Sequence, residues 1–279
     1  LIINKMNTLE YLAKKNPHER EELITFDEGP HIYTIFKTVE DKNNNVNGTT
    51  KYTSVTTWNH SQFDHFNADK IIANMMKSKK WSTNKYYGMT ADEIKASWDK
   101  NRDEAAEAGT KMHFDIECYY NNIDVKNESI EFTYFKNFLN DFPELNLRPY
   151  RTEMIVFHEE LQLAGSIDMI FEREDGKLDI YDWKRCRDIK KTDGWGKCSH
   201  NSIIEHLPDT NYWHYCLQLN TYKAILEQKY GKQVVDLYLV CLHPSNSNNN
   251  YLLIKVVDLQ EEVKELFEQR KNTLILNKK

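Results

Sequence analysis

Gly165-Ser166-Ile167-Asp168 and Asp179-Ile180-Tyr181-Asp182-Trp183-Lys184 are two strand-like segments that end in charged side chains. Side chains two residues apart lie on one face of a strand, so Asp182 and Lys184 share the face of Leu178 and Ile180. We expect the apolar pair to point into a core. The acid and the lysine then emerge together at the strand end, and Asp168 can bring a second carboxylate beside Asp182.

Two carboxylates held close repel each other unless a cation lies between them, and oxygen ligands of this kind suit Mg²⁺ or Mn²⁺. Such an ion polarises a phosphate and lowers the pKa of a bound water. Lys184 is then placed to orient that water or to offset charge in the transition state. A bare Asp-x-Lys is also compatible with a solvated ion pair at a strand end, and only the surrounding sequence separates the two interpretations.

The pattern around these segments predicts an α/β fold with a central mixed sheet. Strand-like runs cover 152–158, 163–171 and 178–184, and helical spacing of apolar residues covers about 64–140. A helix over 211–230, two strands and a last helix from Leu259 follow a polar loop. Two asparagine-rich loops are expected to close hairpins, the first joining 31–36 to 52–57 and the second joining 234–242 to 251–257.

Composition excludes several classes of protein. The chain has 279 residues and a formal charge of -6, and its longest purely apolar run, Leu237 to Leu242, is far shorter than a membrane-spanning helix. Five widely spaced cysteines do not form a disulfide framework and favour an intracellular setting. The acidic balance argues against a tail-type nucleic-acid binder, but it leaves room for basic residues concentrated in one groove.

Further motifs accompany the acid-lysine pair. Asp168-x13-Asp182-x-Lys184 resembles the active-site signature of the PD-(D/E)XK nuclease superfamily, with Asp at its second acidic position. Gly109-Thr110-Lys111-Met112-His113 resembles the G-T-x-x-H element of the RecB-like exonuclease branch, and Gln218-Leu219-Asn220-Thr221-Tyr222 resembles its Q-x-x-x-Y element. Within this branch the chain is similar to the mitochondrial genome maintenance exonucleases and their viral relatives.

The resemblance implies a restriction-endonuclease-like core and a site. It implies one PD-(D/E)XK nuclease domain over 1–279, made of an N-terminal hairpin and helical part (1–108), a catalytic core (109–258) and a C-terminal helix (259–279). It implies one or two Mg²⁺ or Mn²⁺ ions held by His113, Asp168, Asp182 and the carbonyl of Trp183. The catalytic residues it implies are Lys184, Asp182, Asp168 and Glu153, with Gln218 and Tyr222 in support.

Each of the added residues has a plainer interpretation. His113 lies between Met112 and Ile116 and is compatible with a buried core histidine. Gln218 and Tyr222 are compatible with a pair on a helix surface, and Glu153 with a solvent-facing strand residue.

Basic residues are dense just after the second strand. From Lys184 to Lys197 there are six basic and two acidic residues, and Arg185, Arg187, Lys190, Lys191 and Trp195 are our candidates for DNA binding. Trp183 and Trp195 could stack on unpaired bases, although a solvated loop gives the same composition. For a second aromatic group, Trp81, Tyr86 and Tyr87, we expect core packing, with a single-strand channel as the alternative.

The resemblance implies a DNA exonuclease that acts on single-stranded ends in replication, recombination or repair, with a helicase, polymerase or recombination protein as a possible partner. An endonuclease with the same core and an inactive nucleic-acid-binding module are the alternatives. Cysteines with the spacing of the iron-sulfur relatives are lacking after Tyr222, where only Cys241 remains, so we expect no iron-sulfur cluster. No membrane partner is expected, and the expected location is the cytoplasm, nucleus or mitochondrion, including a virus-encoded origin.

Overall fold

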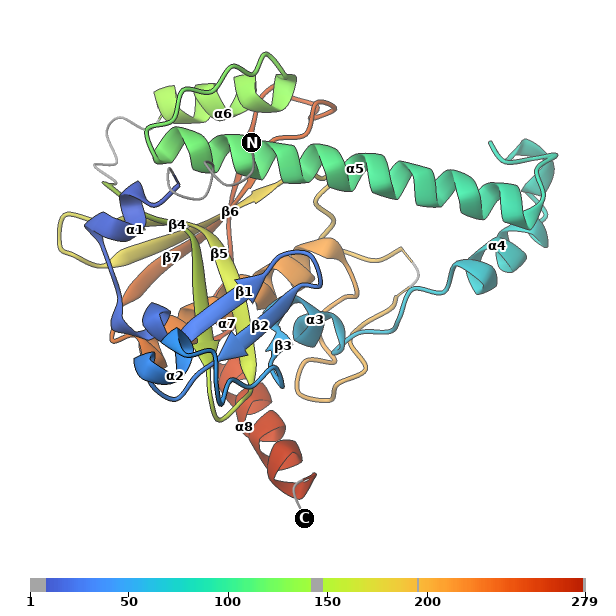
Figure 1. Ribbon diagram of the computed structural model, residues 1–279. Coiled ribbons are helices and arrows are strands. Elements are labelled where there is room, and N and C mark those ends of the chain that lie inside the picture. Colours follow the sequence, from blue (N-terminus) through green and yellow to red (C-terminus); the bar gives the residue numbers. More distant parts are fainter. Residues whose placement is uncertain (1–8, 142–147, 195, 278–279) are drawn as a thin grey trace.

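The computed structural model (Figure 1) describes residues 9–141, 148–194 and 196–277. The described strands are β1 (Ile24–Asp27), β2 (Ile32–Ile35), β3 (Thr53–Ser54), β4 (Arg148–His158), β5 (Leu163–Glu172), β6 (Leu178–Lys184), β7 (Val234–Cys241) and β8 (Leu252–Lys255). The described helices are α1 (Tyr11–Lys15), α2 (Val39–Asn43), α3 (Val55–His60), α4 (Ala68–Met76), α5 (Ala91–Tyr120), α6 (Ile130–Asp141), α7 (Asn211–Lys229) and α8 (Gln260–Leu276), with 3-10 turns η1 (Glu19–Leu23) and η2 (Trp81–Thr83).

A six-stranded mixed sheet forms the centre of the molecule, and a two-stranded antiparallel hairpin, β1–β2, lies beside it. Strand β5 pairs with β4 along one edge. On its other edge β5 pairs with β3 at Leu163 and Ala164 and with β6 from Met169 to Glu172. Strand β6 continues parallel to β7, and β7 pairs with β8. The expected α/β architecture with a mixed sheet is confirmed.

The two faces of β6 lie in different hydrophobic clusters. Leu178 and Ile180 pack in the cluster that contains α7 and α8 residues, as the alternation of the strand predicts. Tyr181 and Trp183 face the cluster of α5 and α6. Trp183 is only 1% exposed and its ring lies 5.6 Å from that of Phe135. The expectation that Trp183 stacks on unpaired bases is therefore wrong, because its ring completes this core.

Helix α5 joins the sheet to a helical projection that we call the arm, residues 68–98, comprising α4, η2 and the start of α5 (Figure 1). Thr90 and Glu93 form a capping box that fixes where α5 begins. Ile72 on α4 and Ile94 on α5 are both buried within the arm. Trp81 and Tyr86 are only partly buried and Tyr87 is 61% exposed, so the expected core packing of these rings is wrong.

The N-terminal strands differ from the expected arrangement. Of residues 31–36, the strand β2 (Ile32–Ile35) pairs with β1 and not with 52–57, where only Thr53 and Ser54 are strand. The Ser54 hydroxyl accepts a hydrogen bond from the N–H of Thr57 at 3.0 Å and so caps α3. The threonines at 53, 56 and 57 favoured a strand, but the Ser54 cap stabilises the first turn of a helix instead. The second expected hairpin, β7–β8, is confirmed.

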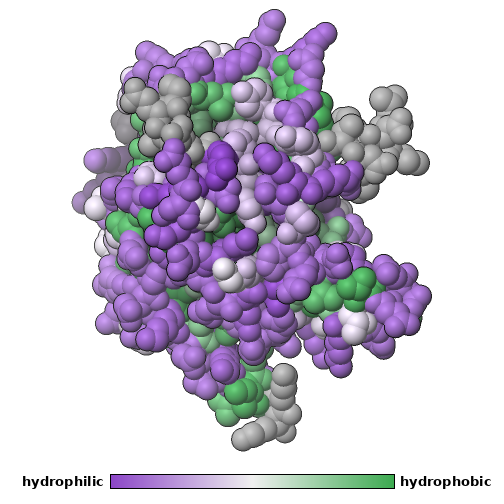
Figure 2. Space-filling view, turned by 90° about the vertical axis from the view of Figure 1, so that its left-hand side faces the viewer, coloured by the Kyte–Doolittle hydropathy of each residue, from purple (hydrophilic) through white to green (hydrophobic). Residues whose placement is uncertain are grey.

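Figure 2 shows a face dominated by hydrophilic residues, with hydrophobic ones in separate patches. Within the described ranges, no helix is both long enough and apolar enough to cross a membrane.

Candidate active site

The candidate site lies where β5 and β6 separate. Their ladder ends at the pair Met169 and Tyr181, after which β6 remains paired with β7 alone. The N–H of Trp183, two residues after Tyr181 on β6, donates a hydrogen bond to Asp168 Oδ2 at 3.0 Å. The Asp168 carboxylate thus accepts an N–H that a backbone carbonyl would accept in a continued ladder. This hydrogen bond holds Asp168 at the end of β6, where the two strands diverge.

Asp182 and Lys184 form an ion pair at that diverging end. Lys184 Nζ lies 2.7 Å from Asp182 Oδ2, and it lies over the ring of Tyr215 from α7 at 4.7 Å from the centroid. Burial raises the pKa of Asp182 to about 6, against the effect of Lys184. For Lys184, burial would lower the pKa, but Asp182 and Asp168 outweigh it and hold the pKa above its ordinary value. Lys184 is therefore a cation at neutral pH.

His113 reaches the same place from α5. Its Nδ1 lies 3.5 Å from Asp168 Oδ2 and 3.9 Å from Glu153 Oε1. Burial alone would lower the pKa of His113, but the two carboxylates outweigh burial and raise the pKa to about 9. The side chain keeps 29% of its surface exposed, so His113 is not a core histidine in apolar surroundings.

Glu153 sits opposite Asp168 in the β4–β5 register and has a left-handed backbone, with φ of 43°. Non-glycine residues rarely adopt this conformation, and such strain concentrates at functional sites. The Ser166 hydroxyl donates a hydrogen bond to Glu153 Oε2 at 2.6 Å and fixes the carboxylate. Glu153 is therefore not a simple solvent-facing strand residue.

The ligand atoms of His113, Glu153 and Asp168 all lie within 4.8 Å of one another. One imidazole and two carboxylates suit a divalent cation such as Mg²⁺ or Mn²⁺. Apart from the ion pair with Lys184, the buried Asp182 Oδ2 has no hydrogen-bond partner among the described residues. A buried carboxylate oxygen whose one described partner is Lys184, beside three grouped ligands, fits a cation site.

Gln218 and Tyr222 lie on α7 behind β5. Tyr222 is 3% exposed and hydrogen-bonded to Gln218, and burial raises its pKa well above the ordinary value. A Cβ on Gly165 would lie 2.7 Å from the Tyr222 hydroxyl oxygen. Tyr222 thus packs directly on β5 three residues before Asp168, which excludes a helix-surface pair and supports the strand that carries the acid.

Two residues near the site were not in the predicted set. Glu117 follows His113 by one helical turn, and burial together with the charge of Glu153 raises its pKa to about 7. Tyr215 precedes Gln218 by three residues on α7 and contacts Lys184. Glu117 lies four residues after His113, and Tyr215 lies three residues before Gln218. Residues at these spacings share a helix face with the motif residue, and this spacing could have identified both from the sequence.

The predicted DNA-binding residues differ in their surroundings. Arg187, Lys190 and Lys191 are exposed in the loop after β6. Arg185 is instead held in an ion pair with Glu131 at 2.7 Å. Trp195 lies outside the described residues.

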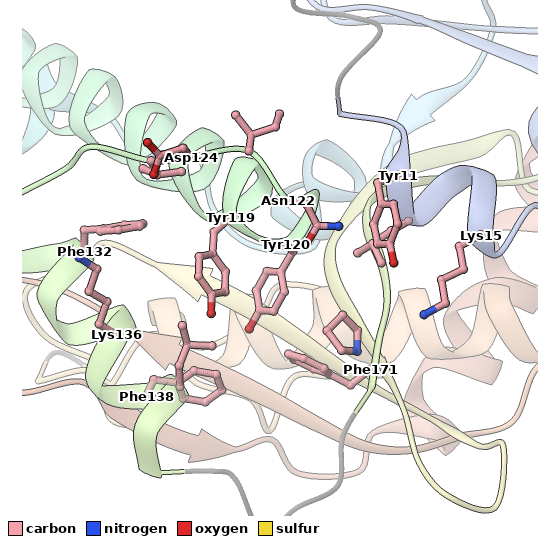
Figure 3. Close-up of a pocket in the computed structure, with 15 residues that line it drawn as sticks. Tyr11, Lys15, Tyr119, Tyr120, Asn122, Asp124, Phe132, Lys136, Phe138 and Phe171 are labelled. Atoms are coloured by element: carbon pink, nitrogen blue, oxygen red, sulfur yellow. The ribbon is translucent and has the colours of Figure 1, made fainter.

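A separate hollow of about 940 Å³ lies between α1, the end of α5 and α6. Figure 3 shows Tyr119, Tyr120 and Phe138 around it, with Lys15 and Lys136 near its rim. Tyr120 and Phe138 belong to the cluster on the Trp183 face of β6, away from the face that carries Asp182 and Lys184. None of the described lining residues belongs to the candidate site.

Two acids and a lysine meet where β5 and β6 separate within the mixed sheet, next to a histidine and a third acid, and this set of side chains suits metal-dependent hydrolysis. A family model for the PD-(D/E)XK nuclease superfamily matches residues 71–277, and the chain belongs to this superfamily. No curated protein matches the chain in a sequence comparison.

Two solved structures match this chain in a structure comparison. A repair endonuclease from Pyrococcus abyssi is 20% identical with a TM-score of 0.24, and the match covers 52% of this chain and 45% of that one. The chain thus spans less than half the length of that protein. A candidate exonuclease from Eubacterium rectale is 12% identical with a TM-score of 0.34, and the match covers 80% of this chain and 82% of that one.

Proposed function

We propose that this protein is a divalent-metal-dependent DNA exonuclease that hydrolyses phosphodiester bonds at single-stranded ends in DNA replication, recombination or repair. The observation that carries the proposal is the grouping of His113, Glu153 and Asp168 beside the Asp182–Lys184 ion pair. His113, Glu153, Asp168 and Asp182 would hold Mg²⁺ or Mn²⁺, together with the carbonyl of Trp183. Such an ion polarises the phosphate and lowers the pKa of a bound water.

The residues of the chain have distinct roles in this reaction. Lys184, held protonated by two carboxylates, donates hydrogen bonds that orient the attacking water and offsets the negative charge that develops on the phosphate. A protonated lysine does not abstract a proton, so its role is positioning and charge compensation. The Asp182 ion pair and the Tyr215 ring fix the direction of its ammonium group.

The preference for single strands rests on the arm. Phe66, just before it, is 73% exposed and Tyr87 is 61% exposed. Five exposed lysines lie in the same part of the chain: Lys70, Lys77, Lys79, Lys80 and Lys85. Exposed rings among cations are the combination that binds unpaired bases and their phosphates. Arg187, Lys190 and Lys191 add positive charge beside the catalytic strand.

The decisive experiment is a time course on end-labelled linear single-stranded, linear double-stranded and circular single-stranded DNA, with Mg²⁺, Mn²⁺ or EDTA. An exonuclease shortens the linear single strand from an end and leaves the circle intact. Cleavage of the circle would establish an endonuclease instead. DNA binding with no cleavage under either metal would establish an inactive binding module, and full activity in excess EDTA would exclude metal catalysis.

A further inference from the structure

Two cysteines lie in contact at the end of the catalytic strand. Cys186 follows Lys184 by two residues, and Cys241 is the register partner of Lys184 on β7. Their sulfur atoms are 3.7 Å apart, and Cys241 Sγ lies 2.9 Å from the carbonyl oxygen of Cys186. A disulfide has a sulfur-sulfur distance of about 2.05 Å, so a shift of less than about 2 Å would bond them.

The contact also perturbs both thiols. A hydrogen bond from Cys186 lowers the pKa of Cys241 to about 7, while the same contact raises the pKa of Cys186. Cys241 therefore ionises more readily than an ordinary thiol, and thiolates are the form that oxidants attack. Cys241 is 1% exposed, but Cys186 is only partly buried, which gives a small peroxide access to the pair.

Cys186 is connected to the catalytic lysine through Tyr215. The Cys186 thiol and the Tyr215 hydroxyl share a hydrogen bond, and the ring of Tyr215 lies under Lys184 Nζ. A movement of Cys186 toward Cys241 would break that hydrogen bond and release the ring that supports the ammonium group. The same movement would displace the first residues of the basic loop after β6.

We propose that Cys186 and Cys241 form a reversible, peroxide-driven disulfide that withdraws Tyr215 from Lys184 and slows the nuclease. The thiolate of one cysteine attacks a peroxide oxygen and the O–O bond breaks, which gives a sulfenic acid and a hydroxide that takes a proton from solvent to become water. The second sulfur then attacks the sulfenic sulfur, and the departing hydroxide takes the remaining thiol proton as a second water. Peroxide is reduced and two thiols become one disulfide. The effect on cleavage rests on the proposed nuclease function.

The test uses the full chain, treated with hydrogen peroxide, blocked with a maleimide and digested without reductant for mass spectrometry. We expect one cross-linked peptide pair joining residues 186 and 241, lighter by two hydrogens than its parts and separated by dithiothreitol. Lys184, now 17% exposed, should become more reactive toward an acetylating reagent than before oxidation, measured against Lys177 on the β5–β6 turn. Single-strand cleavage should fall at least about tenfold, a change of about 1.4 kcal/mol, and recover on reduction.

Control variants separate this pair from other thiols. Cys198→Ser removes an exposed cysteine and should leave the cross-link and the response to peroxide unchanged. Cys186→Ser and Cys241→Ala should each abolish the cross-link and the response to peroxide. Peroxide that oxidises Cys198 but gives no 186–241 cross-link overturns the proposal, as does a cross-link that changes neither Lys184 acetylation nor cleavage. If the untreated chain cleaves no DNA, the proposed nuclease function fails, while the cross-link and the acetylation still test the disulfide.

Discussion

The carboxylate of Asp168 accepts the backbone N–H of Trp183, 3.0 Å away, at the point where β5 and β6 stop pairing. One oxygen of a candidate metal ligand is therefore anchored to the backbone of the strand that carries Asp182 and Lys184. The site needs no loop to bring these groups together, because the separation of two strands exposes the N–H that positions the acid.

Replacing Asp168 by asparagine tests its two roles, as acceptor of the Trp183 N–H and as candidate metal ligand. The amide oxygen of Asp168→Asn can still accept the Trp183 N–H, so we expect the fold to be retained, while loss of the charge beside His113 lowers the free energy of unfolding by no more than about 3 kcal/mol. The lost negative charge should lower cleavage at least about a hundredfold by weakening metal binding. Denaturant titration and the oligonucleotide assay measure the two effects. Asp175→Asn, on the exposed β5–β6 turn, is the matched control and should retain activity.

Removal of either member of the ion pair at the end of β6 should abolish cleavage. For Asp182→Ala and Lys184→Ala we expect losses of at least about a thousandfold, with the far-ultraviolet circular dichroism of the wild type retained. Lys184→Ala also leaves Asp182 buried without its counter-charge, so its melting temperature should fall. Lys177→Ala removes an exposed lysine from the preceding turn as a control. Full activity in either site variant would refute the assigned roles.

The pKa of His113 predicts how stability depends on pH. Because carboxylates raise this pKa from 6.5 to about 9, the protonated histidine stabilises the folded chain fully below pH 6.5. That contribution, at most about 3 kcal/mol, is lost as the pH rises through about 9. Melting curves of the wild type and His113→Gln in EDTA, from pH 6 to 10, should therefore converge at alkaline pH. Divergence at alkaline pH would contradict the pKa direction.

Two glycines should respond oppositely to alanine. In Gly165→Ala the new Cβ would meet the Tyr222 ring at under 3 Å, so strain or displacement of α7 should destabilise the fold by about 1–3 kcal/mol. In Gly109→Ala the new Cβ meets nothing within 4 Å, and alanine is the better helix former by roughly 1 kcal/mol. Thermal unfolding of both variants measures the contrast. Equal destabilisation would show that the Tyr222 contact is not what requires glycine.

Exposed rings near the arm should govern binding of single strands. We expect Phe66→Ala and Tyr87→Ala each to weaken binding of a single-stranded oligonucleotide several-fold or more, on the scale of about 1–3 kcal/mol for a stacked base. Duplex binding should change less because paired bases do not expose their faces. Tyr11→Ala removes another half-exposed ring, at the separate hollow beside α1, and serves as the control. Fluorescence anisotropy distinguishes these outcomes.

The sheet and its acid-lysine pair could be predicted because they depend on local alternation. Leu178 and Ile180 point into the core. Because side chains alternate along a strand, Asp182 and Lys184 must lie on the same face of β6 as these two residues. The ring of Trp183 could not be placed this way, since alternation does not say that α5 and α6 cover the other face. The left-handed backbone of Glu153 is also invisible to side-chain patterns, because it depends on how β4 is held against β5.

Longer-range contacts set the other limits. Cys186 and Cys241 are 55 residues apart and meet only because β6 and β7 run parallel. At Ser54, by contrast, the incorrect prediction had a local cause. The β-branched neighbours favoured a strand, whereas the serine hydroxyl caps a helix, and the capped helix is what forms.

The position of β6 between two hydrophobic clusters also constrains the order of folding. One face requires α7 and α8, the other α5 and α6, and the ligands themselves come from residues 113, 153, 168 and 182. With only one cluster formed, the proposed metal ligands are not all held together. The proposed hydrolytic activity therefore requires the completed fold, and an ion that binds only the native chain adds to its stability.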